Sequence, residues 1–354
     1  MRVRKDREPT TIQSTSELAA YLGLSRWTVS RALNGHPEIG NETRQRVEEA
    51  VTRFQFVPSP MARALRGGRT RMVGICLQEL EKLNLSSKIS TLQYQLREVG
   101  FRSLLEFGDG GSAIEAEILQ HFISMQVEAV AVFSGVLSRR DAAFRTLREA
   151  NIPVVQIDPG SPSHPDTVWI DRGSAMEQTA RHLLELGHRS FATLGINPQG
   201  YYGPIRSRSL AKCLNPPNAP AAVRVVHLFE PEALQLDFDS GQRLAERLLA
   251  LKEIPTALVC LSDKVAIGAM EYLKGRGYRI PEDFSVTGYD NSDLSMICTP
   301  ALTTVDPQVD KLIELAVDLL LNSIENMQNR RRPSQRVEPR LILRRSTGKP
   351  RGAV

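Results

Sequence analysis

Residues 15–33, TSELAAYLGLSRWTVSRAL, contain two short amphipathic helical patterns on either side of a glycine. Two such helices can bury their apolar stripes against a shared small core. Gly23 between them suits a tight connection, because glycine adopts a left-handed backbone conformation without strain. The stretch therefore predicts a helix-turn-helix whose apolar positions are Leu18, Ala19 and Leu22 in the first helix and Val29, Ala32 and Leu33 in the second.

The flanking residues supply the expected helix caps. Ser14 stands three residues before Glu17, the spacing of a capping box, and Ser25 can cap the second helix in the same way. The second helix also carries a polar face opposite its apolar stripe. The residues of that polar face are Arg26, Trp27, Ser30 and Arg31. They predict contact with nucleic acid, and the alternative is a pair of ordinary surface helices with solvated arginines.

The charge of the chain is concentrated in the same region. Residues 1–71 hold 13 Lys and Arg against 7 Asp and Glu, whereas the rest of the chain holds 32 against 33. A small basic module on a nearly neutral body is typical of proteins that neutralise DNA phosphates. This distribution favours the nucleic-acid interpretation over the solvated-helix alternative.

A short helical pattern follows at residues 58–68, PSPMARALRGG. Ser59 can act as N-cap, Pro60 fits the first helical position, and two glycines end the helix after barely two turns. Such a helix is too short to be stable alone. It is expected to be a hinge that becomes helical only when a binding partner stabilises it. Ala62 and Leu65 form a small apolar face suited to a DNA minor groove.

With these motifs the chain resembles the lactose and galactose repressor family of bacterial transcriptional regulators. The resemblance is specific and spans nearly the full length. Its N-terminal part is carried by residues 14–25, 28–34, 42–44, 46–47 and 61–65, and its C-terminal part by 187–189, 262–263, 266–269, 281–283, 286–290, 302–304 and 345–347.

Composition independently predicts a soluble cytoplasmic protein. The 354 residues, 41% of them hydrophobic, suffice for two or three domains with large cores. The N-terminus is charged and has no signal core, and the longest apolar run, near residues 129–133, is far too short for a membrane span. Four dispersed cysteines, at 76, 213, 260 and 298, predict reduced thiols and no zinc site. Because no catalytic or phosphate-loop motif occurs, we expect neither an enzyme nor a cofactor.

After Arg71, β-rich runs alternate with helical patterns, which is βαβ rhythm. The expected fold is an all-α helix-turn-helix headpiece followed by an α/β body of two doubly wound parallel-sheet lobes. The family resemblance implies that these lobes are like those of periplasmic binding proteins. The expected strands lie near residues 72–77, 103–107, 129–133, 154–158, 191–196, 223–228, 257–261 and 284–288.

The expected domains follow from these patterns and the resemblance. A flexible basic arm (1–13) precedes the helix-turn-helix domain (14–57) and the hinge helix with its linker (58–70). The effector-binding and dimerisation body (71–347) comprises an N-lobe of about 71–169 and 307–335 and a C-lobe of about 170–306 and 336–347, and a tail follows (348–354).

Ligands of doubly wound sheets bind outside the carboxyl ends of the strands. Three candidates lie after such strands: Arg206, Asp263 and Asp290. A guanidinium and carboxylates can discriminate the polar groups of a ligand in a dry cleft. The alternatives are that Asp263 caps the following helix, that Asp290 forms an Asx-turn, and that Arg206 is simply solvated.

The resemblance implies a homodimer whose two headpieces occupy successive major-groove faces of a pseudo-palindromic operator in double-stranded DNA. Arg26, Trp27 and Arg31 are the candidates for reading base edges, and paired Leu65 side chains would insert at one central base step while Ala62 approaches the groove floor. The residues expected to position phosphates are Ser14, Ser30, Asn34 and Thr43.

The expected function is therefore a sequence-specific transcriptional repressor controlled by a small polar effector, carbohydrate-like by resemblance. Departures from the family at residues 83–85 and at Ser209-Leu210 leave the effector class open. Tyr201 and Tyr202 could stack on a sugar ring or pack locally. The competing functions are a constitutive repressor with a degenerate pocket and, from another class, a sugar-binding receptor with the same two-lobed body.

Overall fold

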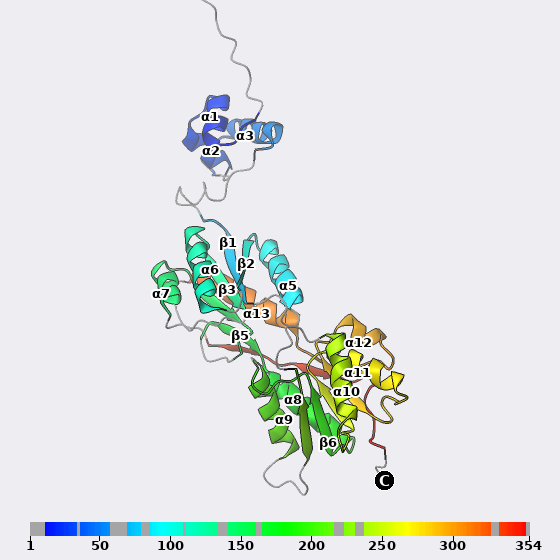
Figure 1. The fold of residues 1–354 in the computed structure, drawn as a ribbon. Helices are drawn as coiled ribbons and strands as arrows, with labels where there is room; N and C mark the ends of the chain where they lie inside the picture. Colours follow the sequence, from blue (N-terminus) through cyan, green and yellow to red (C-terminus); the bar gives the residue numbers. More distant parts are fainter. Residues whose placement is uncertain are drawn as a thin grey trace, which may run out of the picture. The chain divides into compact units, whose positions relative to one another are not determined.

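A computed structural model describes residues 11–33, 36–56, 69–78, 85–108, 111–133, 141–160, 165–200, 202–215, 223–230, 237–326 and 333–351. The chain forms two compact units, Met1–Arg71 and Met72–Val354, which are treated separately (Figure 1). The first unit is the helical headpiece and the second is the α/β body.

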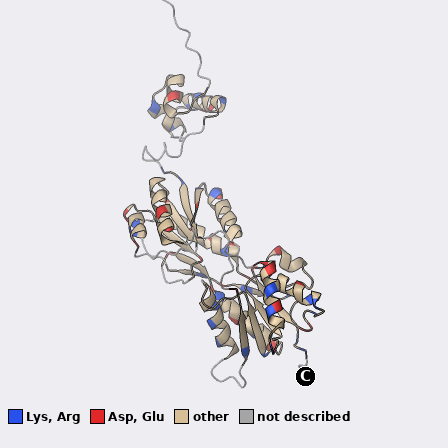
Figure 2. Ribbon diagram, in the orientation of Figure 1, with Lys and Arg blue, Asp and Glu red and all other residues tan. Residues whose placement is uncertain are grey.

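The described residues of the headpiece form the helices α1 (Thr15–Leu22), α2 (Arg26–Leu33) and α3 (Asn41–Phe54). Both apolar stripes expected from the sequence point into one core, where Val47 and Ala50 of α3 join them. Figure 2 marks the Lys and Arg positions along the ribbon, and no Lys or Arg of α2 or α3 belongs to this core. The helix-turn-helix prediction is confirmed.

The first two helices of the headpiece are capped by the residues expected from the sequence. Gly23 has φ +65°, and the Ser14 hydroxyl accepts a hydrogen bond from the Glu17 amide at 3.1 Å. The Ser25 hydroxyl accepts one from the amide of Thr28 at 3.0 Å. The carboxylate of Glu17 accepts its bond from the amide of Gln13, one residue before the cap, at 2.8 Å. Both helices of the motif therefore begin with the backbone satisfied by side chains.

The first sheet of the body is entirely parallel, in the order β11-β5-β4-β3-β1-β2. Helices α5 (Leu85–Glu98) and α13 (Val309–Glu325) cover one face, and α6 (Ser112–Ser124) and α7 (Ala142–Glu149) cover the other. The strands are β1 (Met72–Gln78), β2 (Arg102–Gly108), β3 (Ala129–Phe133), β4 (Val154–Ile157), β5 (Thr167–Ile170) and β11 (Gln335–Val337).

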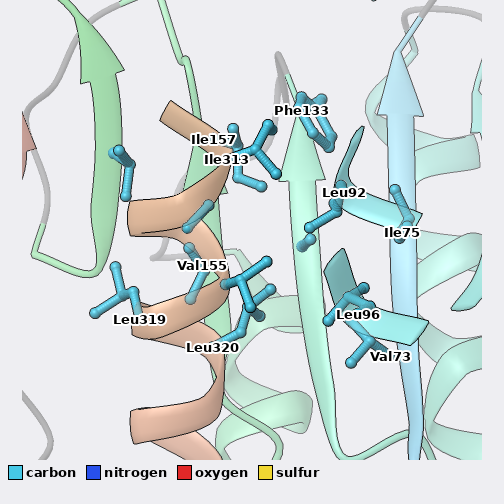
Figure 3. Close-up of a cluster of buried hydrophobic side chains, with 14 of the residues drawn as sticks. Val73, Ile75, Leu92, Leu96, Phe133, Val155, Ile157, Ile313, Leu319 and Leu320 are labelled. Carbon is cyan, nitrogen blue, oxygen red and sulfur yellow. The ribbon is translucent and has the colours of Figure 1, made fainter. Parts of the chain in front are cut away.

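Alternation along the strands of the first sheet divides its core into two. In β1, Val73 and Ile75 face α5 and α13, whereas Cys76 faces α6 and α7. Figure 3 shows Leu96 of α5 and Leu320 of α13 directed at the strands from the same side. The central strands are buried on both faces, as crossover helices require.

The second sheet has the order β12-β10-β9-β8-β6-β7. Helices α8 (Arg172–Glu185) and α9 (Gly203–Leu214) cover one face, α10 (Phe238–Leu249) and α11 (Asp263–Gly275) the other, and the short α12 (Asp293–Ile297) follows β9. The strands are β6 (Ser190–Leu194), β7 (Arg224–Leu228), β8 (Ala257–Cys260), β9 (Ser285–Tyr289), β10 (Thr303–Asp306) and β12 (Arg340–Ile342).

The prediction of two doubly wound sheets is confirmed, with one difference at an edge. Strand β12 runs antiparallel to β10, so the second sheet is not entirely parallel. The chain passes to the second sheet after β5, returns after β10 to form α13 and β11, and passes again to β12. Neither sheet is thus built from one continuous segment of sequence.

Several sequence expectations fall partly outside the described residues. These include the arm, of which residues 1–10 are not described, and most of the hinge with Ala62 and Leu65. The four cysteines are described, and all are free; Cys76 and Cys260 are buried. Among the described helices, none combines the length and apolar character that crossing a bilayer demands.

Helices α10 and α11 pack unusually closely through glycines. A Cβ placed on Gly268 would lie 2.0 Å from the carbonyl oxygen of Phe238, whereas one on Gly275, in the same helix, would meet nothing within 4 Å. Gly268→Ala should therefore lower the free energy of unfolding by about 1 to 3 kcal/mol through overpacking. Gly275→Ala should leave it unchanged or raise it by up to about 1 kcal/mol. Urea denaturation of both variants measures the difference, and equal effects would contradict the close packing.

Candidate functional site

The outer face of α2 carries an arginine stacked on a tryptophan. Trp27 is 61% exposed, and the guanidinium carbon of Arg31 lies 4.0 Å from the centroid of its ring. Arg31 also forms an ion pair with Glu38. Trp27 therefore belongs with Arg31 on the exposed face and does not fold back over Val29 in the core.

The other headpiece candidates are placed as follows. Arg26 is exposed at the first position of α2, and Ser30 is half-buried on the same helix. Thr43 is half-buried in the first turn of α3, and Ser14 caps α1. Asn34 lies outside the described residues, as do Ala62 and Leu65. The DNA-contacting roles of all these residues stay predictions.

In the body, Arg206 is a buried cation. It lies in the first turn of α9 with only 2% of its surface exposed, and its Nη1 donates to the carbonyl oxygen of Leu261 at 3.1 Å. The guanidinium carbon stands 4.3 Å from the ring centroid of Tyr289. Among the described residues, no carboxylate forms an ion pair with it, and its Nε has no hydrogen-bond partner. Burial lowers the pKa of this guanidinium. The solvated-arginine alternative is therefore wrong.

Asp263 is buried at the start of α11, and its carboxylate is already engaged. Oδ2 accepts from the amide of Ser292 at 2.7 Å and from its hydroxyl at 2.8 Å, and Oδ1 accepts from the hydroxyl of Thr304. The helix cap is the neighbouring Ser262, whose hydroxyl accepts from Val265 at 3.3 Å. Asp263 thus links α11 to the segments after β9 and in β10, and its ligand role stays a prediction.

Asp290 directly follows β9 and has an unusual backbone conformation, φ 114°. Its amide donates to Val305 on the neighbouring strand at 2.8 Å. Burial, together with the charge of Asp263, raises the pKa of its carboxyl to about 8, although Arg206 opposes the shift. The three sequence candidates follow the adjacent strands β6, β8 and β9, so the structure brings them to one edge of the second sheet.

A second charged cluster at the first sheet was not foreseen from the sequence. Asp158, directly after β4, is buried and forms two hydrogen bonds of 2.6 Å with the guanidinium of Arg172. Lys88 of α5 binds the same carboxylate with its ammonium group at 2.5 Å. Burial alone would raise the pKa of Asp158, but Arg172 and Lys88 hold it well below its usual range.

Tyr202 connects this cluster to the second sheet. Its hydroxyl donates to the backbone carbonyl of Asp158 at 2.7 Å, and its ring centroid lies 3.6 Å from the guanidinium carbon of Arg172. Tyr202 immediately precedes α9, which packs on the second sheet, whereas Asp158 follows a strand of the first. Of the two uses considered for Tyr202, packing against a neighbour is the one observed; Tyr201 lies outside the described residues.

The site thus combines buried guanidinium groups, tyrosine rings and carboxylates at the carboxyl ends of strands from both sheets. The sequence was compared with protein families of known function. A model of the lacI family of bacterial regulatory proteins matches residues 15–59, and a periplasmic-binding-protein-like domain matches residues 180–347. The protein named HTH-type transcriptional repressor PurR from Erwinia tasmaniensis is 31% identical over 93% of this chain and 95% of its own length.

The chain belongs to the lacI family. As a member it is a DNA-binding regulator of transcription. The PurR repressor of Mannheimia succiniciproducens is 28% identical over 94% of this chain and 98% of its own length. In fold, the lacI-family protein matches a Lac repressor dimer bound to operator and the anti-inducer ONPF, with a TM-score of 0.82 and 21% identity over 96% of this chain and 99% of that one.

The buried Asp158 cluster should be important for the stability of this lacI-family protein. Asp158→Asn leaves Lys88 and Arg172 buried without their counter-charge, so the free energy of unfolding should fall by about 3 to 5 kcal/mol. The control is Glu230→Gln, which breaks the bidentate pair of Glu230 with the exposed Arg243 and should cost at most about 1 kcal/mol. Chemical denaturation compares the two variants, and similar losses would show that the buried cluster is not tightly coupled.

Proposed function

We propose that this lacI-family protein is a homodimeric repressor that reads a pseudo-palindromic operator through α2 and releases or tightens that binding in response to a small polar effector at the strand ends of its body. The single observation that carries the proposal is a folded headpiece with an exposed arginine and tryptophan face, on the same chain as a body with buried polar groups lacking partners. Such a chain has a reading surface and a sensing site.

The geometry of α2 supports base reading by Arg31. Its stacking on Trp27 fixes the guanidinium on the exposed side, and Glu38 is its partner in the unbound headpiece. An exposed ion pair of this kind contributes at most about 1 kcal/mol. A bidentate arginine contact to guanine contributes about 1 to 3 kcal/mol of discrimination, so exchanging Glu38 for a base edge is favourable.

Exposed apolar side chains support the dimer. Met296 and Ile297 on α12 are 54% and 74% exposed, and Leu294 and Leu343 are also exposed. A short helix with three such side chains is unfavourable in water unless another surface covers it. Further exposed apolar residues lie on the first sheet's edge strand β2 and on or just after α5, namely Phe107, Tyr94 and Val99. A symmetric dimer would cover both areas and set the spacing of two headpieces.

The competing functions are less well supported. A constitutive repressor with a degenerate pocket would be expected to have filled or neutralised its site, yet the described part of the body retains buried donors without partners. A sugar-binding receptor would have no use for the basic headpiece. Control by an effector follows if the ligand binds one arrangement of the two sheets better than another, because only differential affinity shifts such an equilibrium.

Base reading is tested with Arg31→Ala. An operator is first obtained by selecting tight binders from random duplexes, and affinities are then measured at fixed salt for operator and random DNA. The variant should lose about 5- to 160-fold on the operator, corresponding to the roughly 1 to 3 kcal/mol of a base contact, and much less on random duplexes. Arg243→Ala, on the surface of the body, is the control and should change neither. Equal losses on both duplexes would reject base reading by Arg31.

The dimer is tested with Ile297→Asp. A charge placed in a buried apolar interface should shift the monomer–dimer equilibrium of the full chain toward monomer, measured by sedimentation at several concentrations. Ile254→Asp changes another exposed isoleucine, 37% exposed, away from α12 and should sediment as the wild type. Sedimentation of Ile297→Asp identical to the wild type would exclude α12 from the interface.

A further inference from the structure

The body buries three cationic side chains near the carboxyl ends of its strands. Lys88, Arg172 and Arg206 are 6%, 5% and 2% exposed, and they belong to α5, α8 and α9, the helices after β1, β5 and β6. Fully buried lysines and arginines are rare unless they are paired, because removing a charge from water is costly. Each of these three therefore requires a compensating partner.

The carboxylate of Asp158 cannot offer a ligand any further bonds. Oδ1 accepts from Arg172 and from the amide of Ile170, and Oδ2 accepts from Arg172 and Lys88. Two carboxylate oxygens provide about four acceptor sites, and all four are used. The cluster also has two cations for one anion, so an excess positive charge remains at this point.

The carboxylate of Asp263 is likewise committed. It accepts three hydrogen bonds, from the amide and hydroxyl of Ser292 and from the hydroxyl of Thr304. None of these donors is a cation, so Asp263 does not form an ion pair with Arg206. Two of the three carboxylates at the site therefore stabilise the protein itself and have little capacity left for hydroxyl groups of a ligand.

The buried polar atoms without partners are mainly donors. Among the described residues they include Nε of Arg206, Nε of Arg172 and the hydroxyl of Tyr289. Arg172 and Arg206 are linked through Tyr202, whose ring centroid lies 3.6 Å from the guanidinium carbon of Arg172 and whose carbonyl oxygen accepts from the Arg206 amide at 3.3 Å. Burial lowers the pKa of Arg206, and the positive charge of Arg172 also lowers it. Both charges act on Tyr289, whose ring lies against Arg206. The three donors therefore lie in one buried region, in which the two guanidinium charges repel each other. A hydrogen-bond acceptor bound there would relieve that repulsion.

We propose that the effector is an organic anion, whose carboxylate or phosphate oxygens accept hydrogen bonds from Nε of Arg206, Nε of Arg172 and the hydroxyl of Tyr289. This inference rests on the proposed function and replaces the carbohydrate-like effector expected from resemblance with an acidic one. A neutral sugar presents hydroxyls that donate as well as accept, so it is best bound by a balance of donors and acceptors. Here the buried atoms without partners on Arg206, Arg172 and Tyr289 are donors, and the Asp158 cluster holds two cations for one carboxylate, which matches an anion.

The placement of Arg172 explains how an anion would influence the body. Arg172 opens α8, which packs on the second sheet, but its guanidinium is held by Asp158 of the first sheet. An anion bound to both Arg172 and Arg206 would therefore add a bond between the Asp158 cluster and the second sheet. The effector would favour the arrangement of the sheets in which these guanidinium groups are closest.

The first test needs no knowledge of the effector and uses inorganic phosphate as the probe. Thermal unfolding of the full chain is compared in sodium phosphate and in sodium chloride of equal ionic strength, for the wild type, Arg206→Met and Arg243→Met. Phosphate at about ten times its dissociation constant should raise the wild-type Tm by about 2 to 4 °C more than that of Arg206→Met. General salting effects cancel because they act on all three proteins, and Arg243→Met should follow the wild type.

Arg206→Lys is the second variant, in case the methionine variant does not fold. It keeps the charge but removes the Nε donor, so it should retain only part of the phosphate effect. Equal phosphate effects on the wild type and on the folded Arg206 variants would overturn the proposal.

The second test uses matched neutral and acidic compounds: ribose with ribose 5-phosphate, and glucose with glucuronate and glucose 6-phosphate. Calorimetry should show binding of at least one acidic member, with affinity at least about tenfold higher than that of its neutral counterpart and lost in Arg206→Met. Operator affinity is measured in parallel.

The outcomes separate the two proposals. Neutral sugars that bind and change operator affinity while the acids do not would overturn the anionic effector and leave effector control intact. An acid that binds without changing operator affinity would support the anion site and overturn effector control. Absence of binding by every compound, together with equal phosphate effects, would overturn the anion site.

Discussion

The carboxylate of Asp158 is the contact on which the body of the protein depends. It accepts bonds from α5, from β5 and from the first residue of α8, while its backbone carbonyl accepts from Tyr202 before α9. Elements of both sheets therefore meet at one residue. A buried carboxylate is unfavourable by itself, and it is stable here because two cations and a peptide amide replace water.

The hydrogen bonds that engage the buried carboxylates also determine which polar groups remain available to bind a ligand. The carboxylates of Asp158 and Asp263 are engaged by the protein, whereas the buried atoms without partners among the described residues include the donors on Arg172, Arg206 and Tyr289. Like charges that share a buried region are unfavourable, and a ligand of opposite charge removes that repulsion. The proposed chemistry of the ligand thus follows from which groups the fold has already satisfied, and a list of polar residues at the site would not reveal it.

The sequence predicted local features well and long-range pairing poorly. Periodicity and caps identified both helices around Gly23, and βαβ rhythm with the strand-end rule brought Arg206, Asp263 and Asp290 together. The three-residue strands β11 and β12 were too short to produce a period. The pairing of Lys88 with Asp158 joins residues 70 positions apart, for which no local pattern exists. The sequence also could not show that Asp263 is saturated, because that depends on Ser292 and Thr304 being folded against it.

The route of the chain through the two sheets has a consequence for biosynthesis. Strands β11 and β12 come late in the sequence, yet one completes the first sheet and the other completes the second. Translation therefore delivers the headpiece before the body, as a small unit with its own core, whereas both sheets stay unfinished until β11 and β12 leave the ribosome. A truncated translation product would keep the DNA-binding headpiece but lack a complete α/β body, so the order of synthesis makes translation through β12 a condition for the proposed control of DNA binding by the body.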